Sequence, residues 1–223
     1  MNLKCILPFL FSAYFVVPVI SQSTNPISDI NKKLLTGNTT ISAVLTDTAF
    51  MFLHSQPAFR EVIKNNAKAE AIQLTTDNEP GGKISVTGVV LDKAGIALSN
   101  KLVYVYQTSS EGWYSDTAPH ILKNEGDRKH ARLFGYFKTG AQGKFKFATV
   151  KPKGYPNSTL PAHIHIEIAL DGNQSFISEL LFDDDPRLVN EIRARAVQEK
   201  FLIVKNSGTK EEPVYSYIIQ IDK

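Results

Sequence analysis

The chain has 223 residues, of which 43% are hydrophobic and 21% are charged, and its formal net charge is +3. This balance is typical of a globular protein with one main domain. Lysine and arginine do not gather into a basic cluster of five or more residues, so we expect no nucleic-acid partner.

Residues 1–21 have the composition of a secretory signal peptide. One lysine precedes an apolar run from Cys5 to Val17, and the Val-Ile-Ser ending suits cleavage before Gln22. The alternative is an uncleaved membrane anchor, but the apolar run is shorter than the ~20 residues that a membrane span needs. We therefore expect a secreted protein, or a periplasmic one in a bacterium, with no membrane attachment after cleavage.

Cys5 is the single cysteine of the sequence, so the mature chain would contain none. This excludes disulfides, zinc–thiolate sites, iron–sulfur clusters and a cysteine nucleophile. Any metal must be bound by histidine, tyrosine or carboxylate side chains. Sequons for N-glycosylation occur at Asn38, Asn157 and Asn173, and they matter if the source is eukaryotic.

Residues 22–80 are predicted to form a helical and linker segment in front of the main domain. Residues 22–40 are polar and rich in Ser, Thr and Asn, so we expect a loosely ordered leader there. Residues 47–74 contain apolar positions without alternation, which predicts two short helices interrupted near Pro57. The sequence TTDNEPGG that follows has the composition of a linker.

Residues 81–223 are predicted to form an antiparallel β-sandwich, which makes the protein mainly β. Alternating runs separated by turn residues predict roughly eight short strands. These runs are 84–91, 102–107, 133–139, 144–150, a run from His163, 176–182, 201–204 and 214–221. A short helix is expected from Asp185 to about Gln198. Residues 108–132 form a long polar loop, and loops of this length tend to be functional.

The most informative stretch is VKPKGYPNSTLPAHIHIEIAL, from Val150 to Leu170. His163 and His165 alternate with isoleucines, which predicts a β-strand with one apolar face and one face that carries both imidazoles. Side chains on the same face of a strand lie roughly 6.5 to 7 Å apart, so both histidines can reach one metal ion. An isolated H-x-H pair is also typical of a half-exposed strand without a metal.

Two tyrosines favour the metal site over this alternative. Tyr155 lies in a turn stiffened by proline and glycine, eight residues before His163, and Tyr114 lies in the long polar loop. Two phenolates and two neutral imidazoles favour a trivalent ion that prefers oxygen ligands, and iron(III) is the natural candidate. The phenol pKa is near 10, so the metal must displace the proton of each tyrosine.

At these residues the sequence resembles the intradiol ring-cleavage dioxygenases, over about residues 78–185. The similarity includes the Glu-Gly-Trp-Tyr motif that ends at Tyr114, the Tyr155-Pro156 turn and the run Pro161-Ala162-His163-Ile164-His165. The resemblance implies that iron(III) is bound by Tyr114, Tyr155, His163 and His165. It also implies cleavage of a catechol-type aromatic diol with O2 to a muconate-type diacid, with Tyr155 as the catalytic residue that accepts a substrate proton.

Three positions differ from the pattern of that family. Leu160 replaces an arginine that directly precedes the Pro-Ala-His-Ile-His run, Glu179 replaces a glutamine on the following strand, and Gly154 replaces a proline. In the family, the arginine and the glutamine are thought to stabilise negative charge on the reacting ring. We therefore expect normal iron binding with slower turnover, or a substrate that brings compensating groups. Candidates to replace the missing charge are Arg128, Arg132 and Lys153.

Two other functions remain open from the sequence. A secreted transthyretin-like β-sandwich that binds without catalysis would share the Thr87-Gly88-Val89-Val90 opening, and a protein that sequesters iron or copper would need the same metal ligands. Red-brown colour from tyrosinate bound to iron(III) separates the iron sites from the binding module. Three histidines remain. His54 is interpreted as a partly buried residue with its hydrogen bonds satisfied. His120 and His130 are interpreted as solvent-facing loop residues, with a place next to the metal ligands or in a lid over the site as the alternative.

Overall fold

The computed structural model describes residues 25–115 and 129–221. The expected signal peptide, His120 and Arg128 lie outside these ranges. Nine strands form two sheets in the described part, with the orders β1-β5-β2-β9 and β4-β3-β6-β7-β8. The strands are β1 Ile72–Gln73, β2 Lys83–Asp92, β3 Leu102–Gln107, β4 Leu133–Lys138, β5 Lys144–Val150, β6 His163–Ala169, β7 Ser175–Phe182, β8 Leu202–Val204 and β9 Val214–Ile221. The expectation of a mainly β protein is confirmed.

The two sheets share one hydrophobic core between their inner faces. Alternation places the apolar side chains of each strand on this side, as in β5, where Phe145 and Phe147 are buried and the lysines that alternate with them, Lys144 and Lys146, are exposed. Phe137 of β4 contacts Phe145 of β5 with ring centroids 5.4 Å apart, and Phe182 of β7 meets Tyr215 of β9 edge-on at 4.8 Å. Burial of these rings therefore joins the two sheets.

The sheets are mixed, which corrects the expectation of antiparallel pairing throughout. Three neighbouring pairs are parallel: β1 with β5, β2 with β9, and β7 with β8. Parallel neighbours need a long connection, and the segment between β7 and β8 provides one because it contains the helix α5, Asn190–Gln198. This helix begins five residues after Asp185, because residues 183–188 form hydrogen-bonded turns instead.

The expected loosely ordered leader is wrong for its described part, because α1, Pro26–Leu35, is a regular helix. Asn25 caps its first turn by accepting a hydrogen bond from the backbone N–H of Ile27 at 3.0 Å, and Pro26 occupies the start, where no N–H is needed. Ile30 and Leu34, one turn apart, are buried. The polar composition of this segment therefore reflects the solvent-facing side of an amphipathic helix.

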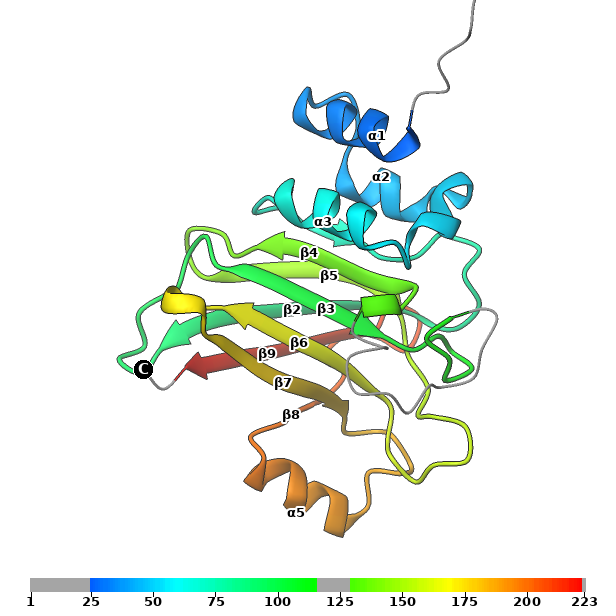
Figure 1. Ribbon diagram of the computed structural model, residues 1–223. Coiled ribbons are helices and arrows are strands. Elements are labelled where there is room, and N and C mark those ends of the chain that lie inside the picture. Colours follow the sequence, from blue (N-terminus) through cyan, green and yellow to red (C-terminus); the bar gives the residue numbers. More distant parts are fainter. Residues whose placement is uncertain (1–24, 116–128, 222–223) are drawn as a thin grey trace, which may run out of the picture.

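Figure 1 shows α1 to α3 as a layer beyond β4, with α5 at the opposite end of the sheets. The remaining helices are α2 Ile41–Thr46, a 3-10 turn Thr48–Leu53, α3 Pro57–Asn65 and a 3-10 turn Asp171–Asn173. Arg60 of α3 is buried and donates hydrogen bonds to the carbonyls of His54 and Ala131, at 2.9 and 3.0 Å, and to the Tyr104 hydroxyl. The helical layer is thus fixed to the sheet that carries the histidine strand. Within the described ranges, no helix has the length and apolarity required to cross a membrane.

Candidate metal centre

The four predicted metal ligands lie together in the structure. The Tyr114 hydroxyl is 2.8 Å from the Tyr155 hydroxyl and 2.9 Å from Nε2 of His165. The Tyr155 hydroxyl is also 2.8 Å from Nε2 of His163. Two oxygens and two nitrogens from a loop, a turn and a strand therefore converge on one point. Their role as ligands stays a prediction, but this donor set is the one that suits iron(III).

Strand β6 presents both histidines on the face of the sheet opposite the core, while Ile164, Ile166 and Ile168 point into the core. His163 is buried, and its Nδ1 lies 2.9 Å from the carbonyl of Pro161. A carbonyl can only accept, so Nδ1 carries the proton and Nε2 keeps a lone pair aimed at the cluster. Histidines that bind metals are oriented in this way by a hydrogen bond from their other nitrogen.

The segments that carry Tyr114 and Tyr155 contact each other at Gly112 and Gly154. Gly112 has φ +88°, and a Cβ there would lie 2.5 Å from the carbonyl oxygen of Gly154. A Cβ on Gly154 would in turn lie 2.3 Å from the carbonyl oxygen of Leu160. No side chain fits at either position without moving backbone. Glycine at 154, one of the departures noted in the sequence, therefore allows the turn that carries Tyr155 to pack closely against its neighbours.

Asp185 and Arg187 hold the Tyr155 turn beside the histidine strand, and the sequence interpretation missed both. The Asp185 carboxylate accepts hydrogen bonds from the backbone N–H of Ala162 at 2.9 Å and of Arg187 at 2.8 Å. Nη1 of Arg187 donates to the carbonyls of Tyr155 and Leu160 at 3.2 and 3.4 Å. The sequence predicts a helix start at Asp185-Pro186, although Asp before Pro is also a turn signal.

Glu179 of β7 lies opposite His165 of β6, and its carboxylate is 3.6 Å from Nδ1 of that histidine. Burial raises the pKa of the Glu179 carboxyl above its usual range, an effect that nearby His163 opposes. In the described part of the chain, one group of three histidine, cysteine or carboxylate side chains has its possible metal-ligand atoms within 4.8 Å of one another. It consists of His163, His165 and Glu179. Because Nε2 of His165 faces Tyr114, Glu179 is placed to orient the imidazole from its other nitrogen.

A cavity of about 230 Å³ opens beside the cluster, between the β6–β7 surface and α5. Leu160 lines it together with Tyr155, His163 and Glu179. Leu160 precedes β6, so the alternation of that strand does not fix the direction of its side chain, which lines the cavity. Leucine therefore occupies the place at the cavity wall where the sequence comparison expected an arginine.

Neither of the two described candidates replaces that arginine. Arg132 forms a bidentate ion pair with the carboxylate of Glu79, at 2.8 and 2.7 Å, in a largely buried position. Lys153 is exposed and is not among the described residues that line the cavity. Of the other histidines, His54 is fully rather than partly buried, with Nδ1 2.8 Å from the Arg132 carbonyl, and His130 is exposed.

Comparison with known proteins decides the family. A sequence model of the family described as "Dioxygenase" matches residues 55–222. The chain belongs to the intradiol dioxygenase family. The match begins within the helical segment before α3 and ends at the last described strand.

Several curated relatives of this chain are bacterial enzymes. Hydroxyquinol 1,2-dioxygenase from Rhizobium sp. (strain MTP-10005) is 27% identical over 122 residues, which are 48% of this chain and 39% of that protein. The protocatechuate 3,4-dioxygenase beta chain from Burkholderia cepacia is 34% identical over 121 residues, 50% of each chain. The aligned part thus spans about half the length of these relatives, or less.

A solved structure of similar fold is the 3-chlorocatechol 1,2-dioxygenase from Rhodococcus opacus 1CP. It is 20% identical to this chain, with a TM-score of 0.54, and the match covers 89% of this chain and 95% of that one. This likeness shows the fold alone.

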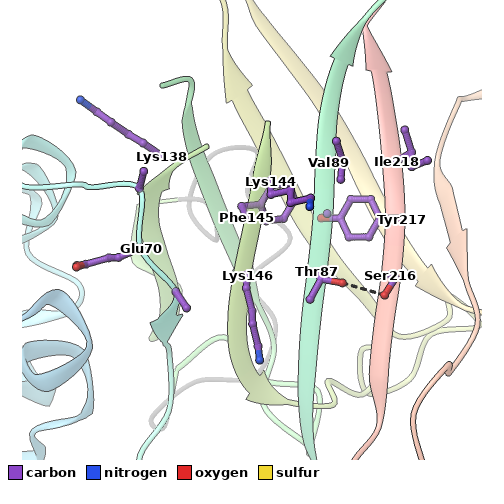
Figure 2. A pocket seen from close by; sticks show the side chains of 13 residues that line it. Glu70, Thr87, Val89, Lys138, Lys144, Phe145, Lys146, Ser216, Tyr217 and Ile218 are labelled. Atoms are coloured by element: carbon purple, nitrogen blue, oxygen red, sulfur yellow. Dashed lines mark hydrogen bonds between the residues drawn. The ribbon is translucent and has the colours of Figure 1, made fainter. Parts of the chain in front are cut away.

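A second cavity, of about 660 Å³, lies on the outer face of the four-stranded sheet (Figure 2). Two of its lining residues, Thr87 and Ser216, are joined by a hydrogen bond of 2.8 Å between their hydroxyl groups. Lys138, Lys144 and Lys146 border it. None of the predicted metal ligands is among its lining residues, so we place the chemistry at the smaller cavity.

Proposed function

We propose that this protein is a secreted, iron(III)-dependent dioxygenase that cleaves a catechol-type diol between its two hydroxyl-bearing carbons. The observation that carries the proposal is the convergence of Tyr114, Tyr155, His163 and His165 within hydrogen-bond distances at the edge of a cavity. The substrates would be the diol and O2, and the product a muconate-type diacid. Both atoms of O2 enter the product, so no external reductant is consumed.

The ligand residues would each have a defined task. Tyr114, Tyr155, His163 and His165 would hold iron(III), whose chemistry when bound is Lewis-acid activation of the diol towards O2. Tyr155 lies at the cavity wall, between Tyr114 and His163, so its oxygen is placed to accept a proton from an entering diol. Leu160, Pro161 and Leu181 provide apolar walls that exclude water from the bound ring.

Oxygen uptake by iron-loaded protein on a panel of catechols tests this function. We expect uptake of one O2 per diol consumed, with a diacid as the product. Tyr155→Phe, which keeps the ring but removes the proton acceptor, should slow turnover by about a hundredfold or more. A protein that holds iron, keeps its fold and consumes no O2 with any catechol would contradict the proposal.

A metal-binding protein without turnover is the second candidate. It is favoured by the carboxylate of Glu179 and the apolar side chain of Leu160 at the cavity, because neither supplies positive charge to a reacting ring. This candidate predicts the same iron content and colour, and it differs from the first in the absence of O2 consumption.

A further inference from the structure

The cavity beside the tyrosine–histidine cluster is lined by apolar side chains and by a small group of charged ones. Its side chains come from the Tyr155 turn, β6, β7 and α5 and the segment that follows α5. The apolar ones are Leu160, Pro161, Leu181, Ile192, Ala196 and Phe201. Apart from Tyr155 and His163 of the cluster, the remaining described lining residues are charged, namely Glu179, Arg195 and Glu199. A ligand that fills this space would thus meet both apolar surface and charged groups.

Among the charged residues that line the cavity, carboxylates outnumber cations. Nε of Arg195 lies 2.7 Å from the Glu199 carboxylate one helical turn away, so the single described cation of the lining already has a partner. Glu179 remains as the second carboxylate, with its side chain 27% exposed. Arg187 is the nearby cation on the Tyr155 turn, and its Nη1 is directed to the carbonyls of Tyr155 and Leu160. A carboxylated ligand would therefore meet repulsion in this cavity, and a cation would meet attraction.

We propose that this site takes catechols that carry a short apolar arm ending in a cation, such as a protonated amine, and discriminates against catechols that carry a carboxylate. The inference rests on the proposed function, because the catechol ring is placed at the tyrosine–histidine cluster. The methylene groups of the arm would lie along the walls formed by Leu181 and Ile192. The ammonium group would lie between Glu179 and Glu199, where each hydrogen-bond donor finds a carboxylate oxygen.

Three catechols with the same substitution position test the proposal: one with an aminoethyl group, one with an ethyl group and one with a carboxyethyl group. For iron-loaded wild-type protein, we expect kcat/KM to fall in that order, with on the order of tenfold or more between the amine and the acid, which is about 1.4 kcal/mol. Calorimetric binding of the three corresponding phenols, which lack the second hydroxyl group, gives a readout that is independent of turnover. The same order is expected there.

Variants on α5 and at its C-terminal end make the test specific to the charges. Glu199→Gln removes a carboxylate and leaves Arg195 without this partner, so the preference for the amine should shrink or reverse. Arg195→Gln removes the cation, so the preference should grow. Glu191→Gln is the matched control, because Glu191 is an exposed carboxylate in the first turn of α5 and is not among the described residues that line the cavity. It should leave the ratio between amine and acid unchanged.

The possible outcomes separate this inference from the proposed function. Ring opening of all three catechols with no preference for the amine, or with the acid preferred, would overturn the inference and leave the function intact. Preferential binding of the aminoethyl phenol without ring opening of any catechol would support the inference as a binding property and overturn the function. A preference for the amine that Glu199→Gln and Arg195→Gln do not move in opposite directions would also contradict the assignment.

Discussion

The imidazole of His165 lies flat against the phenol ring of Tyr106, with ring centroids 4.3 Å apart and an interplanar angle of 11°. The two residues are direct cross-strand neighbours, because β3 and β6 pair Tyr106 with His165. Tyr106 also stacks on Tyr104 at 5.3 Å, and Tyr104 stacks on Tyr136 at 4.4 Å. The ring of His165 is thus held between Tyr106 on its face and Glu179 near its Nδ1.

Tyr106→Ala should weaken iron binding, because the His165 ring loses the surface that fixes its plane. Groups that orient metal-binding histidines typically change metal affinity by about 10- to 100-fold. Competition with a chelator, followed by absorbance, measures this affinity. Tyr106→Phe is the matched control, since it keeps the stacked ring. Equal affinities for the alanine variant and wild type would show that stacking does not position His165.

His163→Ala should remove most of the bound iron, because it deletes one of the four convergent donor atoms. His130→Ala should retain the metal, since His130 is exposed and is not one of the four residues whose donor atoms converge at the cluster. Elemental analysis of protein folded with iron present measures both, with about one iron per chain expected for wild type. Zinc, or no metal, in wild-type protein would refute the ligand assignment.

Glu79→Gln should destabilise the fold by about 3 to 5 kcal/mol, because it breaks a bidentate ion pair in which the side chains of Glu79 and Arg132 are 6% and 14% exposed. The pair also matters locally, since the backbone N–H of Arg132 donates to the carbonyl of Tyr114 at 2.7 Å. Urea unfolding gives the free energy. Asp171→Asn, which alters the more exposed pair of Asp171 with Lys101, should cost less than about 1 kcal/mol. Similar losses of unfolding free energy in both variants would contradict the expected difference between the buried and the exposed ion pair.

Leu160→Arg combined with Glu179→Gln should raise turnover on unsubstituted catechol. Leu160 lines the cavity, so an arginine there can reach a bound ring, and a preorganised cation near developing negative charge is worth roughly 3 kcal/mol, on the order of a hundredfold in rate. Steady-state kinetics at matched iron content measures the change. If wild-type protein already turns over catechol at a rate that the double variant does not improve, another residue supplies the charge.

The sequence predicted most of the β-structure because alternation is a local signal. The expected strands at 102–107, 144–150 and 214–221 have the observed bounds, three others differ by one residue at one end, and the strand expected at 84–91 is one residue longer at each end. Alternation cannot show which strands become neighbours, so the parallel pairing of β9 with β2 was missed. Strand β1 was missed because two residues carry no period, and it exists through pairing of Ile72 with Phe147.

The convergence of the candidate ligands was easiest to predict where they are close in sequence. His163, His165 and Tyr155 fall within one stretch, whereas Tyr114 is a candidate from the distant loop, and family resemblance strengthened its assignment. Tyr106, Asp185 and Arg187 support these residues from other strands and turns, and their polar or aromatic character alone does not distinguish them from ordinary surface residues. Only the register of β3 on β6 and the fold of residues 183–188 bring them to the site.

The fate of isotopically labelled O2 tests the central claim most directly. Iron-loaded protein, a catechol and heavy-isotope O2 are incubated, and the product is analysed by mass spectrometry. We expect a muconate-type diacid with one labelled oxygen in each carboxyl group, because the bond between the two hydroxyl-bearing carbons breaks. An aldehyde-containing product of cleavage outside the diol, or a diacid without label, would contradict it.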